Sequence, residues 1–254
     1  MLIAITRQVS PALARCELSY IERRPIDFGK AREQHLAYEK LLEAQGAHVV
    51  SLRAQRDLPD SMFVEDPALV LDEIAVIFVM GAASRRGEAP SLAKEITKFR
   101  KLEYMEFPGT AEGGDILRIG RNIYVGRTKR TNDEGIRQMK ALLGPLGYDV
   151  RPIGVTGCLH LKSAVTYLGR DTLLANESFF DDAALSNYER IDVDPAEPHA
   201  ANALALGDTI VFPASYPRTR ERIERRGFRV TTIDISELQK AEAGLTCSCL
   251  LFQS

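Results

Sequence analysis

The feature that most constrains this chain is a short unit, two apolar runs joined by a turn, that recurs along the sequence. Each turn carries glycine or Asn/Asp, the residues that tight β-hairpins require. Three clear copies, turning at Gly120, Gly169 and Gly207, lie at Ile116–Gly126, Val165–Ala175 and Ala203–Pro213. A weaker copy lies at Leu69–Phe78. The repeat therefore predicts several hairpins of similar form.

Helix signals alternate with these strand signals. Lys30–Gln45 has helical apolar spacing and stops at a glycine, Asn132 is a good N-cap for a helix ended by Gly147, and Pro217 suits the first turn of another. A strand-like run follows each helix, and Leu2–Thr6 reads as a strand at the start of the chain. This alternation indicates an α/β protein.

A repeated unit that buries its apolar face only against its neighbours must stack or close into a ring. The run Ser248–Phe252 is a strand left over at the C-terminus, and pairing with the N-terminal segment would complete a fifth unit. We therefore predict one domain over residues 1–254, folded as a closed, five-bladed, pseudo-symmetric α/β propeller with a central cavity. The alternative is an open mixed sheet.

Composition excludes several classes of protein. The 254 residues carry 33 Lys and Arg against 35 Asp and Glu, a net charge of −2, which argues against a general nucleic-acid binder. Apolar runs are too short to span a bilayer, and the first six residues are too short for a signal-peptide core. Four cysteines are too few for a disulfide scaffold of this length. These features predict a cytoplasmic protein without a membrane or nucleic-acid partner, and the arginine-rich run 218–229 is interpreted as a solvated helix face.

Two segments gather carboxylates in unusual surroundings. Pro59–Pro67 places three acids around an apolar centre, so the loop is expected to be partly buried. Buried carboxylates need a cation or hydrogen-bond donors. Pro108–Asp115 is a glycine-rich turn with two further acids, and it lacks the lysine of a phosphate-binding loop.

Cysteine and histidine residues define two more segments. Cys158 and His160 lie close together, and Cys247 and Cys249 alternate on what reads as a strand, so they would share a face. Such residues are most often core residues. As zinc ligands they are spaced more tightly than usual. A third reading, one cysteine as nucleophile and one histidine as general acid/base, fits the acid-rich segments if the substrate is a cation.

Taken together, these segments resemble the dimethylarginine dimethylaminohydrolase (dimethylargininase) family of the pentein, or guanidino-group-modifying, superfamily. The resemblance runs from about Leu18 to Phe252. The motifs that carry it are Pro59–Pro67, Gly81–Glu88, Gly109–Asp115, Arg130–Gly135, Leu159–Lys162, Pro213–Glu221 and Leu245–Ser248. The family's fold is a five-bladed α/β propeller, which agrees with the repeat.

The resemblance implies a role for each matching residue. Cys247 matches the nucleophile, His160 the general acid/base, and Glu112 and Asp66 the carboxylates that grip the substrate guanidinium. The implied substrate-binding residues are Leu18, Asp60, Phe63, Glu65, Asp66, Arg85 and Arg130. Asp60 and the Leu18 backbone would meet the α-amine, the two arginines the α-carboxylate, and Phe63 the aliphatic stem.

The implied reaction is hydrolysis of a carbon–nitrogen bond in Nω-methylated L-arginine, giving L-citrulline and an amine through a covalent thiouronium on cysteine. The resemblance implies that the protein needs neither a metal nor an organic cofactor. It also implies a possible homodimer. Two alternatives are a hydrolase of another guanidine, such as an arginine deiminase, and a guanidine-binding protein without activity. The segment His160-Leu-Lys162 replaces the His-x-Asp of deiminases, which favours the methylated substrate.

Overall fold

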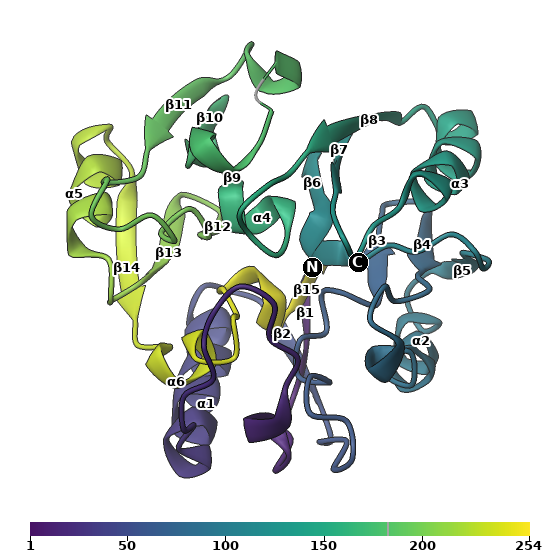
Figure 1. The fold of residues 1–254 in the computed structure, drawn as a ribbon, viewed down its shortest axis with the longest axis horizontal. Coiled ribbons are helices and arrows are strands. Elements are labelled where there is room, and N and C mark those ends of the chain that lie inside the picture. Colours follow the sequence, from purple (N-terminus) through teal and green to yellow (C-terminus); the bar gives the residue numbers. More distant parts are fainter. Residues whose placement is uncertain (182) are drawn as a thin grey trace.

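The computed structural model, which describes residues 1–181 and 183–254, contains five three-stranded sheets arranged around a centre (Figure 1). Each sheet is one blade. In chain order the strands are β1 (Leu2–Arg7), β2 (His48–Leu52), β3 (Ala68–Val70), β4 (Ile74–Ile77), β5 (Lys101–Tyr104), β6 (Ile116–Ile119), β7 (Asn122–Arg127), β8 (Asp149–Gly154), β9 (Val165–Gly169), β10 (Thr172–Ala175), β11 (Glu189–Asp192), β12 (Leu204–Leu206), β13 (Thr209–Pro213), β14 (Arg229–Ile233) and β15 (Leu250–Gln253). The helices are α1 (Phe28–Ala44), α2 (Ala89–Ile96), α3 (Asp133–Leu143), α4 (Leu161–Ala164), α5 (Pro217–Arg225) and α6 (Ser236–Gln239). The predicted five-bladed α/β propeller is confirmed.

Every blade follows one plan. The first two strands pair antiparallel, and the third pairs parallel with the middle strand, as in the sheet β6-β7-β8. A parallel neighbour needs a crossover connection, which α2, α3, α5 and α1 supply in four of the blades. In the blade β9-β10-β11 the connection instead carries short 3₁₀ turns at Glu177–Phe179 and Ala183–Leu185.

The two ends of the chain close the ring. Strand β15 pairs antiparallel with β1, with Ile3 opposite Phe252, and β1 pairs parallel with β2. Figure 1 shows the two termini side by side near the middle of the ring. The predicted fifth unit is therefore formed by the first and last segments of the chain.

Most of the turns and helix ends that the sequence predicts are present in the structure. The turn glycines Gly120, Gly169 and Gly207 have φ of 60°, 90° and 56°, the left-handed conformation that glycine adopts without strain. Two details were wrong. The helix expected to end at Gly147 stops at Leu143, because a 3₁₀ turn containing Pro145 intervenes. The segment Thr246–Ser248 is a 3₁₀ turn and not part of a strand, so the two cysteines do not share a strand face.

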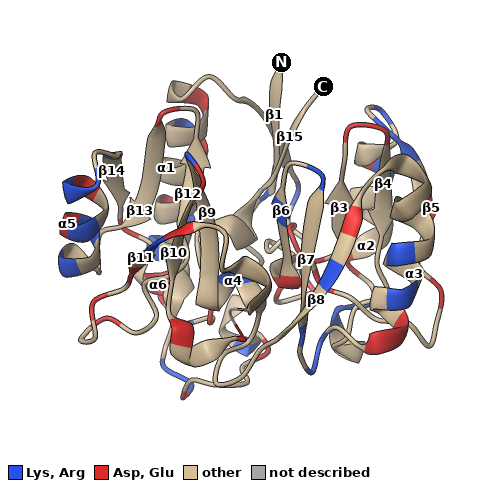
Figure 2. Cartoon of the chain, turned by 90° about the horizontal axis from the view of Figure 1, so that it is seen from above, with Lys and Arg blue, Asp and Glu red and all other residues tan. Residues whose placement is uncertain are grey.

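The apolar core includes clusters that lie between neighbouring blades. For example, Val76 of β4 and Ile123 of β7 share one cluster with Met139 of α3. The charged residues of α5 face outward: blue and red residues alternate there in Figure 2, and Arg220–Glu224 and Glu221–Arg225 form ion pairs. This confirms the solvated helix face and leaves the polar centre of the ring as the unusual feature. Among the described residues, no helix is both long and apolar enough to cross a membrane.

The cap of α3 gives a test of the fold. The Asn132 side chain accepts hydrogen bonds from Gly135 N and Thr110 N and donates one to the Pro108 carbonyl. We expect Asn132→Ala to lower the free energy of unfolding by about 1–2 kcal/mol, measured by chemical denaturation. Asn132→Asp keeps the acceptor and should lose less. Equal stability of Asn132→Ala and the wild type would contradict this role.

Candidate active site

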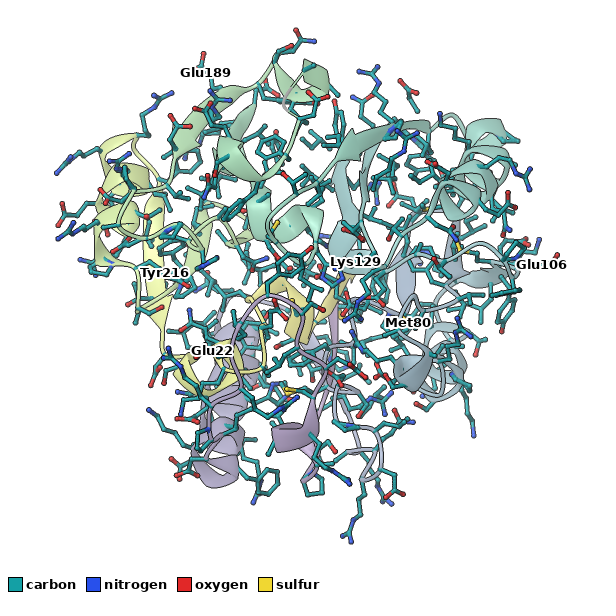
Figure 3. The ribbon with its side chains drawn as sticks, viewed as in Figure 1. Glu22, Met80, Glu106, Lys129, Glu189 and Tyr216 are labelled. Atoms are coloured by element: carbon teal, nitrogen blue, oxygen red, sulfur yellow. The ribbon has the colours of Figure 1, made fainter. Side chains whose placement is uncertain are left out.

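The blades enclose a central cavity of about 160 Å³. Its lining includes Asp66 before β3, Arg85 after β4, Arg130 after β7, His160 before α4 and Cys247 before β15. In Figure 3, Lys129 lies near the middle of the ring while Glu106 and Glu189 mark its periphery. Residues that are far apart in sequence therefore meet because each lies on a loop at the same end of its blade.

Cys247 lies in the 3₁₀ turn that leads into β15, partly exposed to the cavity. The Gly244 N–H points at its sulfur, with N and Sγ 3.4 Å apart. Burial, followed by the charges of Glu65 and Asp66, raises the pKa of the Cys247 thiol well above its usual value. This sulfur is therefore a neutral thiol near pH 7.

The residue before Cys247 is held from two sides. Thr246 N donates to Asn202 Oδ1 at 3.1 Å, and Asn202 Nδ2 donates to Thr246 Oγ1, also at 3.1 Å. The Thr246 hydroxyl in turn donates to Glu65 Oε2 at 2.8 Å, and Lys162 binds the other oxygen of Glu65. Two loops from other blades thus fix the turn that carries the cysteine.

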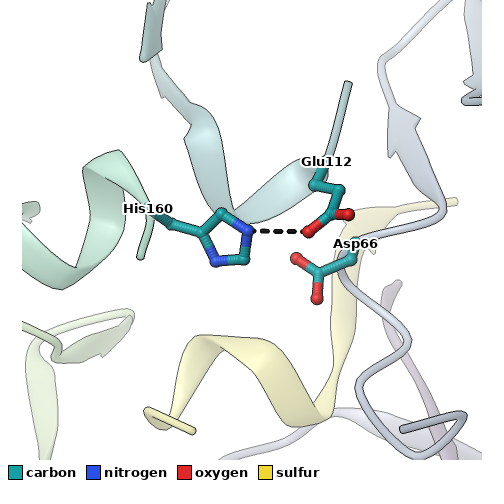
Figure 4. A group of neighbouring side chains, drawn as sticks. All are labelled: Asp66, Glu112 and His160. Carbon is teal, nitrogen blue, oxygen red and sulfur yellow. Dashed lines mark hydrogen bonds and ion pairs between the residues drawn. The ribbon is translucent and has the colours of Figure 1, made fainter. Parts of the chain in front are cut away.

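His160 precedes α4 and its ring is buried. Its Nε2 is 2.8 Å from Glu112 Oε2, as the dashed line in Figure 4 shows. Burial alone would lower the pKa of His160, but the charges of Asp66 and Asp115 and the bond to Glu112 outweigh it and raise that pKa to about 9. Burial would likewise raise the pKa of Glu112, yet the bond and charge of His160, with the two arginines, lower it to about 2. The pair is imidazolium and carboxylate at neutral pH.

Asp115 anchors the loop that carries His160. Its carboxylate accepts hydrogen bonds from Leu161 N at 3.0 Å and from the hydroxyls of Thr128 and Thr131 at 2.7 and 2.6 Å. Burial, partly offset by the charge of His160, raises the pKa of Asp115 to about 6. This acid links the histidine loop to the loop that carries Arg130.

Arg85 is buried and its guanidinium is bound on three sides. It donates from Nη1 to Asp66 Oδ2 at 2.7 Å, and from Nε and Nη2 to Glu88 at 3.0 and 2.9 Å. Nη2 also reaches the Phe63 carbonyl at 3.3 Å. Burial raises the pKa of Glu88 to about 7 even though Arg85 lowers it. The two hydrogen bonds to Glu88 therefore fix the orientation of the Arg85 guanidinium.

Arg130 and Asp60 contact the segment that lies over the cavity. Arg130 Nη1 is 3.3 Å from Glu112 Oε1, and Nη2 donates to Ser19 Oγ at 3.4 Å. The two oxygens of Asp60 accept from Glu17 N at 3.2 and 3.1 Å. Leu18 lies between these contacts, and its side chain packs against the apolar core. The backbone on both sides of Leu18 is thus tied to the site.

The sequence-predicted residues lie together, with two qualifications. Asp60, Phe63, Asp66 and the two arginines line the cavity with the cysteine and histidine. Glu112 is fully buried, and both His160 and Arg130 contact it. The two oxygens of Glu65, predicted to bind substrate, are bound to Lys162 and Thr246 inside the protein.

Sequence reasoning missed several residues of the site. Glu88 falls one turn after Arg85 within a quoted motif, a spacing that could have suggested the pair. Asp115 stands in the glycine-rich turn and was given no role. Asn202 gave no signal, because only the closed ring brings it to Thr246.

One cluster has the donors of a metal site. The side-chain ligand atoms of Asp66, Glu112 and His160 lie within 4.8 Å of one another and are drawn in Figure 4. These donors are already engaged: Asp66 with Arg85, and Glu112 with His160. The cysteines of the zinc alternative point elsewhere, since Cys249 Sγ is 3.1 Å from the Tyr38 hydroxyl and Cys158 Sγ donates to the His160 carbonyl. The geometry is that of a charge-neutralised cluster and does not favour a structural zinc site.

Comparison with known proteins identifies the family of this chain. The family described as N,N dimethylarginine dimethylhydrolase, eukaryotic, matches residues 22–253. Two bacterial N(G),N(G)-dimethylarginine dimethylaminohydrolases are similar. The one from Pseudomonas aeruginosa is 39% identical over 89% of this chain and 90% of its own, and the one from Streptomyces coelicolor is 37% identical over 96% and 94%.

The fold agrees as well. The solved structure of the Pseudomonas aeruginosa enzyme, in a cysteine-to-serine mutant complexed with citrulline, superposes with a TM-score of 0.94 at 36% identity and covers 98% of both chains. The matched length, the identity and the shared ring of blades lead to one conclusion. This chain belongs to the dimethylarginine dimethylaminohydrolase family.

Proposed function

We propose that this protein hydrolyses Nω-methylated L-arginine to L-citrulline and methylamine or dimethylamine. The observation that carries the proposal is a cavity in which a cysteine and a protonated histidine lie beside buried carboxylates. Asp66 and Glu112 offer the negative charge that a guanidinium needs, and His160 lies against them. The complex of the Pseudomonas relative with citrulline supports the same product.

The cavity matches both ends of an amino acid. Arg85 and Arg130 line it, and two arginines suit a carboxylate because guanidinium groups bind it through paired N–H donors. Asp60, near the covering backbone at Leu18, suits an ammonium group, and Phe63 suits the aliphatic stem. Lys162 binds Glu65 and leaves Asp66 and Glu112 as the carboxylates for the guanidinium.

The first half of the reaction forms a covalent intermediate. A bound guanidinium places positive charge beside Cys247 and lowers the pKa of its thiol, which burial otherwise raises. The thiolate attacks the guanidinium carbon, and the carboxylates hold that group cationic and therefore electrophilic. His160 gives its proton to the departing amine as the carbon–nitrogen bond breaks, leaving a thiouronium on Cys247.

The second half restores the enzyme. His160, now neutral, takes a proton from water, and the resulting hydroxide attacks the thiouronium carbon. As the carbon–sulfur bond breaks, the electron pair returns to sulfur, the hydroxyl proton of the adduct passes to the resulting thiolate, and citrulline is released. The Cys247 thiol, which gave its proton to solvent when the substrate bound, is thereby restored.

Three further features are proposals of the same kind. Residues 1–254 act as one catalytic domain, since several blades contribute to the cavity lining. The protein works in the cytoplasm, in keeping with four free cysteines. A homodimer rests on the family resemblance, and light scattering in solution tests it.

Citrulline release tests the proposed activity. Purified protein should form citrulline from asymmetric dimethylarginine, while agmatine, which lacks the carboxylate that the two arginines would bind, should be turned over at least about 100-fold less efficiently. Arginine run in parallel separates a methylarginine hydrolase from a deiminase. Cys247→Ser should lose turnover and still bind citrulline. Turnover of Cys247→Ser near the wild-type rate would exclude covalent catalysis by this residue.

The pH dependence follows from two raised pKa values. Catalysis needs a Cys247 thiolate and a protonated His160, and the pKa of the thiol lies above that of the histidine, which is about 9. Below pH 9, a higher pH increases the fraction of Cys247 in the thiolate form while His160 stays protonated. Above pH 9, each gain in thiolate is matched by a loss of imidazolium. We therefore expect log kcat/KM to rise with pH and to level off near 9.

Glu112→Gln checks the cause of that plateau. Removing this negative charge lowers the pKa of His160, so the plateau should begin at a lower pH. A rate maximum below pH 7 in the wild type, or an unmoved plateau in Glu112→Gln, would contradict the assignment.

The hydrogen bonds of Thr246 with Asn202 and Glu65 can be tested with a matched pair of variants. Thr246→Val keeps the side-chain shape but leaves Glu65 Oε2 and Asn202 Nδ2 without their hydroxyl partner, and Thr246→Ser keeps the hydroxyl. We expect kcat to fall about tenfold or more in Thr246→Val and to stay within about twofold in Thr246→Ser. Citrulline affinity should change little in both, because Thr246 holds the nucleophile turn. Equal kcat values for the two variants would rule out this role.

A further inference from the structure

A covering segment, residues 16–25, passes over the cavity between β1 and α1. Tyr20 and Ile21 of this segment line the cavity, so a ligand inside would lie beneath them. The segment has no helix or strand of its own. Its position therefore depends on side chains that bind its backbone.

Two of these contacts use groups that the proposed substrate also needs. Asp60 binds the Glu17 N–H where a substrate ammonium would bind, and Arg130 binds the Ser19 hydroxyl where a substrate carboxylate would bind. The segment thus satisfies the charged ends of the pocket. An amino-acid ligand competes for both contacts and would weaken the hold on the segment.

A third contact is independent of those groups. The Glu242 carboxylate accepts from Ser19 N at 2.7 Å and from Tyr20 N at 2.9 Å, one oxygen for each N–H. Hydrogen bonds to an ionised acceptor are the stronger kind. Glu242 also has φ of 60°, a conformation that side chains other than glycine rarely adopt. Such strain persists where the surrounding structure imposes it, often at functional positions.

We propose that Glu242 is the latch that keeps the covering segment closed over an occupied site, and that it thereby positions the Leu18 backbone against the ligand. This inference rests on the proposed function for the identity of the occupant. Glu242 lies five residues before Cys247, on the loop that leads into the nucleophile turn. The same loop therefore carries the nucleophile and the latch. Glu242 is a positioning residue, since it acts through the covering segment.

The segment contains a trypsin site, Arg23, whose cleavage can report when the segment detaches from the cavity. Arg23 is exposed, and its guanidinium donates to the carbonyls of Ala14 and Cys16, both at 2.6 Å. Trypsin can cut after Arg23 only when the segment leaves this position. The next bond, Arg24–Pro25, resists trypsin because proline follows. The cut after Arg23 therefore measures opening.

The test compares Glu242→Gln and Glu242→Gly with the wild type, free and with saturating citrulline. Both variants lose the charged latch, and glycine also relieves the strained backbone, so Glu242→Gly should unfold at the same temperature or higher. We expect cleavage after Arg23 to be about tenfold faster than wild type with citrulline bound, and less accelerated in the free protein, where Asp60 and Arg130 still hold the segment. KM for the methylated substrate should rise about fivefold or more, with a smaller change in kcat.

Glu224→Gln is the matched control, because it makes the same substitution at a half-exposed, ion-paired glutamate on α5. It should match the wild type in cleavage and KM. Cleavage within twofold of wild type in both Glu242 variants, with and without citrulline, would overturn the latch. So would a drop in unfolding temperature large enough to explain faster cleavage. If citrulline leaves the rate of wild-type cleavage unchanged, it does not displace the contacts of Asp60 and Arg130 and the proposed function fails, while the comparison of free proteins still tests the latch.

Discussion

The centre of the ring depends on a buried cluster of charges that neutralise one another. Asp66 lies between Arg85 and His160, and Glu112 between His160 and Arg130, all of them almost inaccessible to solvent. Burying one such charge alone would cost several kcal/mol, and removing one partner leaves the other uncompensated. Loss of any one of these charges would therefore destabilise the others. The protein's own guanidinium and imidazolium groups therefore neutralise the buried acids that the proposed function assigns to the substrate guanidinium.

The propeller supplies what this cluster requires. Each blade brings a loop to the centre, so the cysteine, the histidine and the acids can come from distant parts of the chain while their strands pack in apolar clusters shared by neighbouring blades. The turn that carries Cys247 is held by contacts with other loops. It is joined to Asn202 and Glu65 through Thr246, and to the covering segment through Glu242. The proposed latch and the proposed nucleophile thus lie within a single stretch of six residues.

Much of the fold could be predicted from local patterns. The hairpins, their positive-φ glycines, the Asn132 cap and the pairing of the terminal strands all follow from short-range chemistry and from the need to close a repeat. Element ends were less certain: Pro145 shortened α3, and an apolar run around Cys247 looked like a strand although tertiary contacts bend it into a turn. The roles of site residues came from the family resemblance. Contacts made only on ring closure, such as Asn202 to Thr246 or Glu65 to Lys162, leave no mark in sequence spacing.

The central claim is that the ring assembles a cysteine that attacks a guanidinium held by carboxylates. The most direct measurement is intact-mass analysis of the protein quenched in acid during turnover of asymmetric dimethylarginine, followed by peptide mapping. The account predicts a transient species heavier by the mass of the substrate less dimethylamine, carried by the peptide that contains Cys247. Steady citrulline formation with no such species, or with the added mass on Cys249, would contradict it.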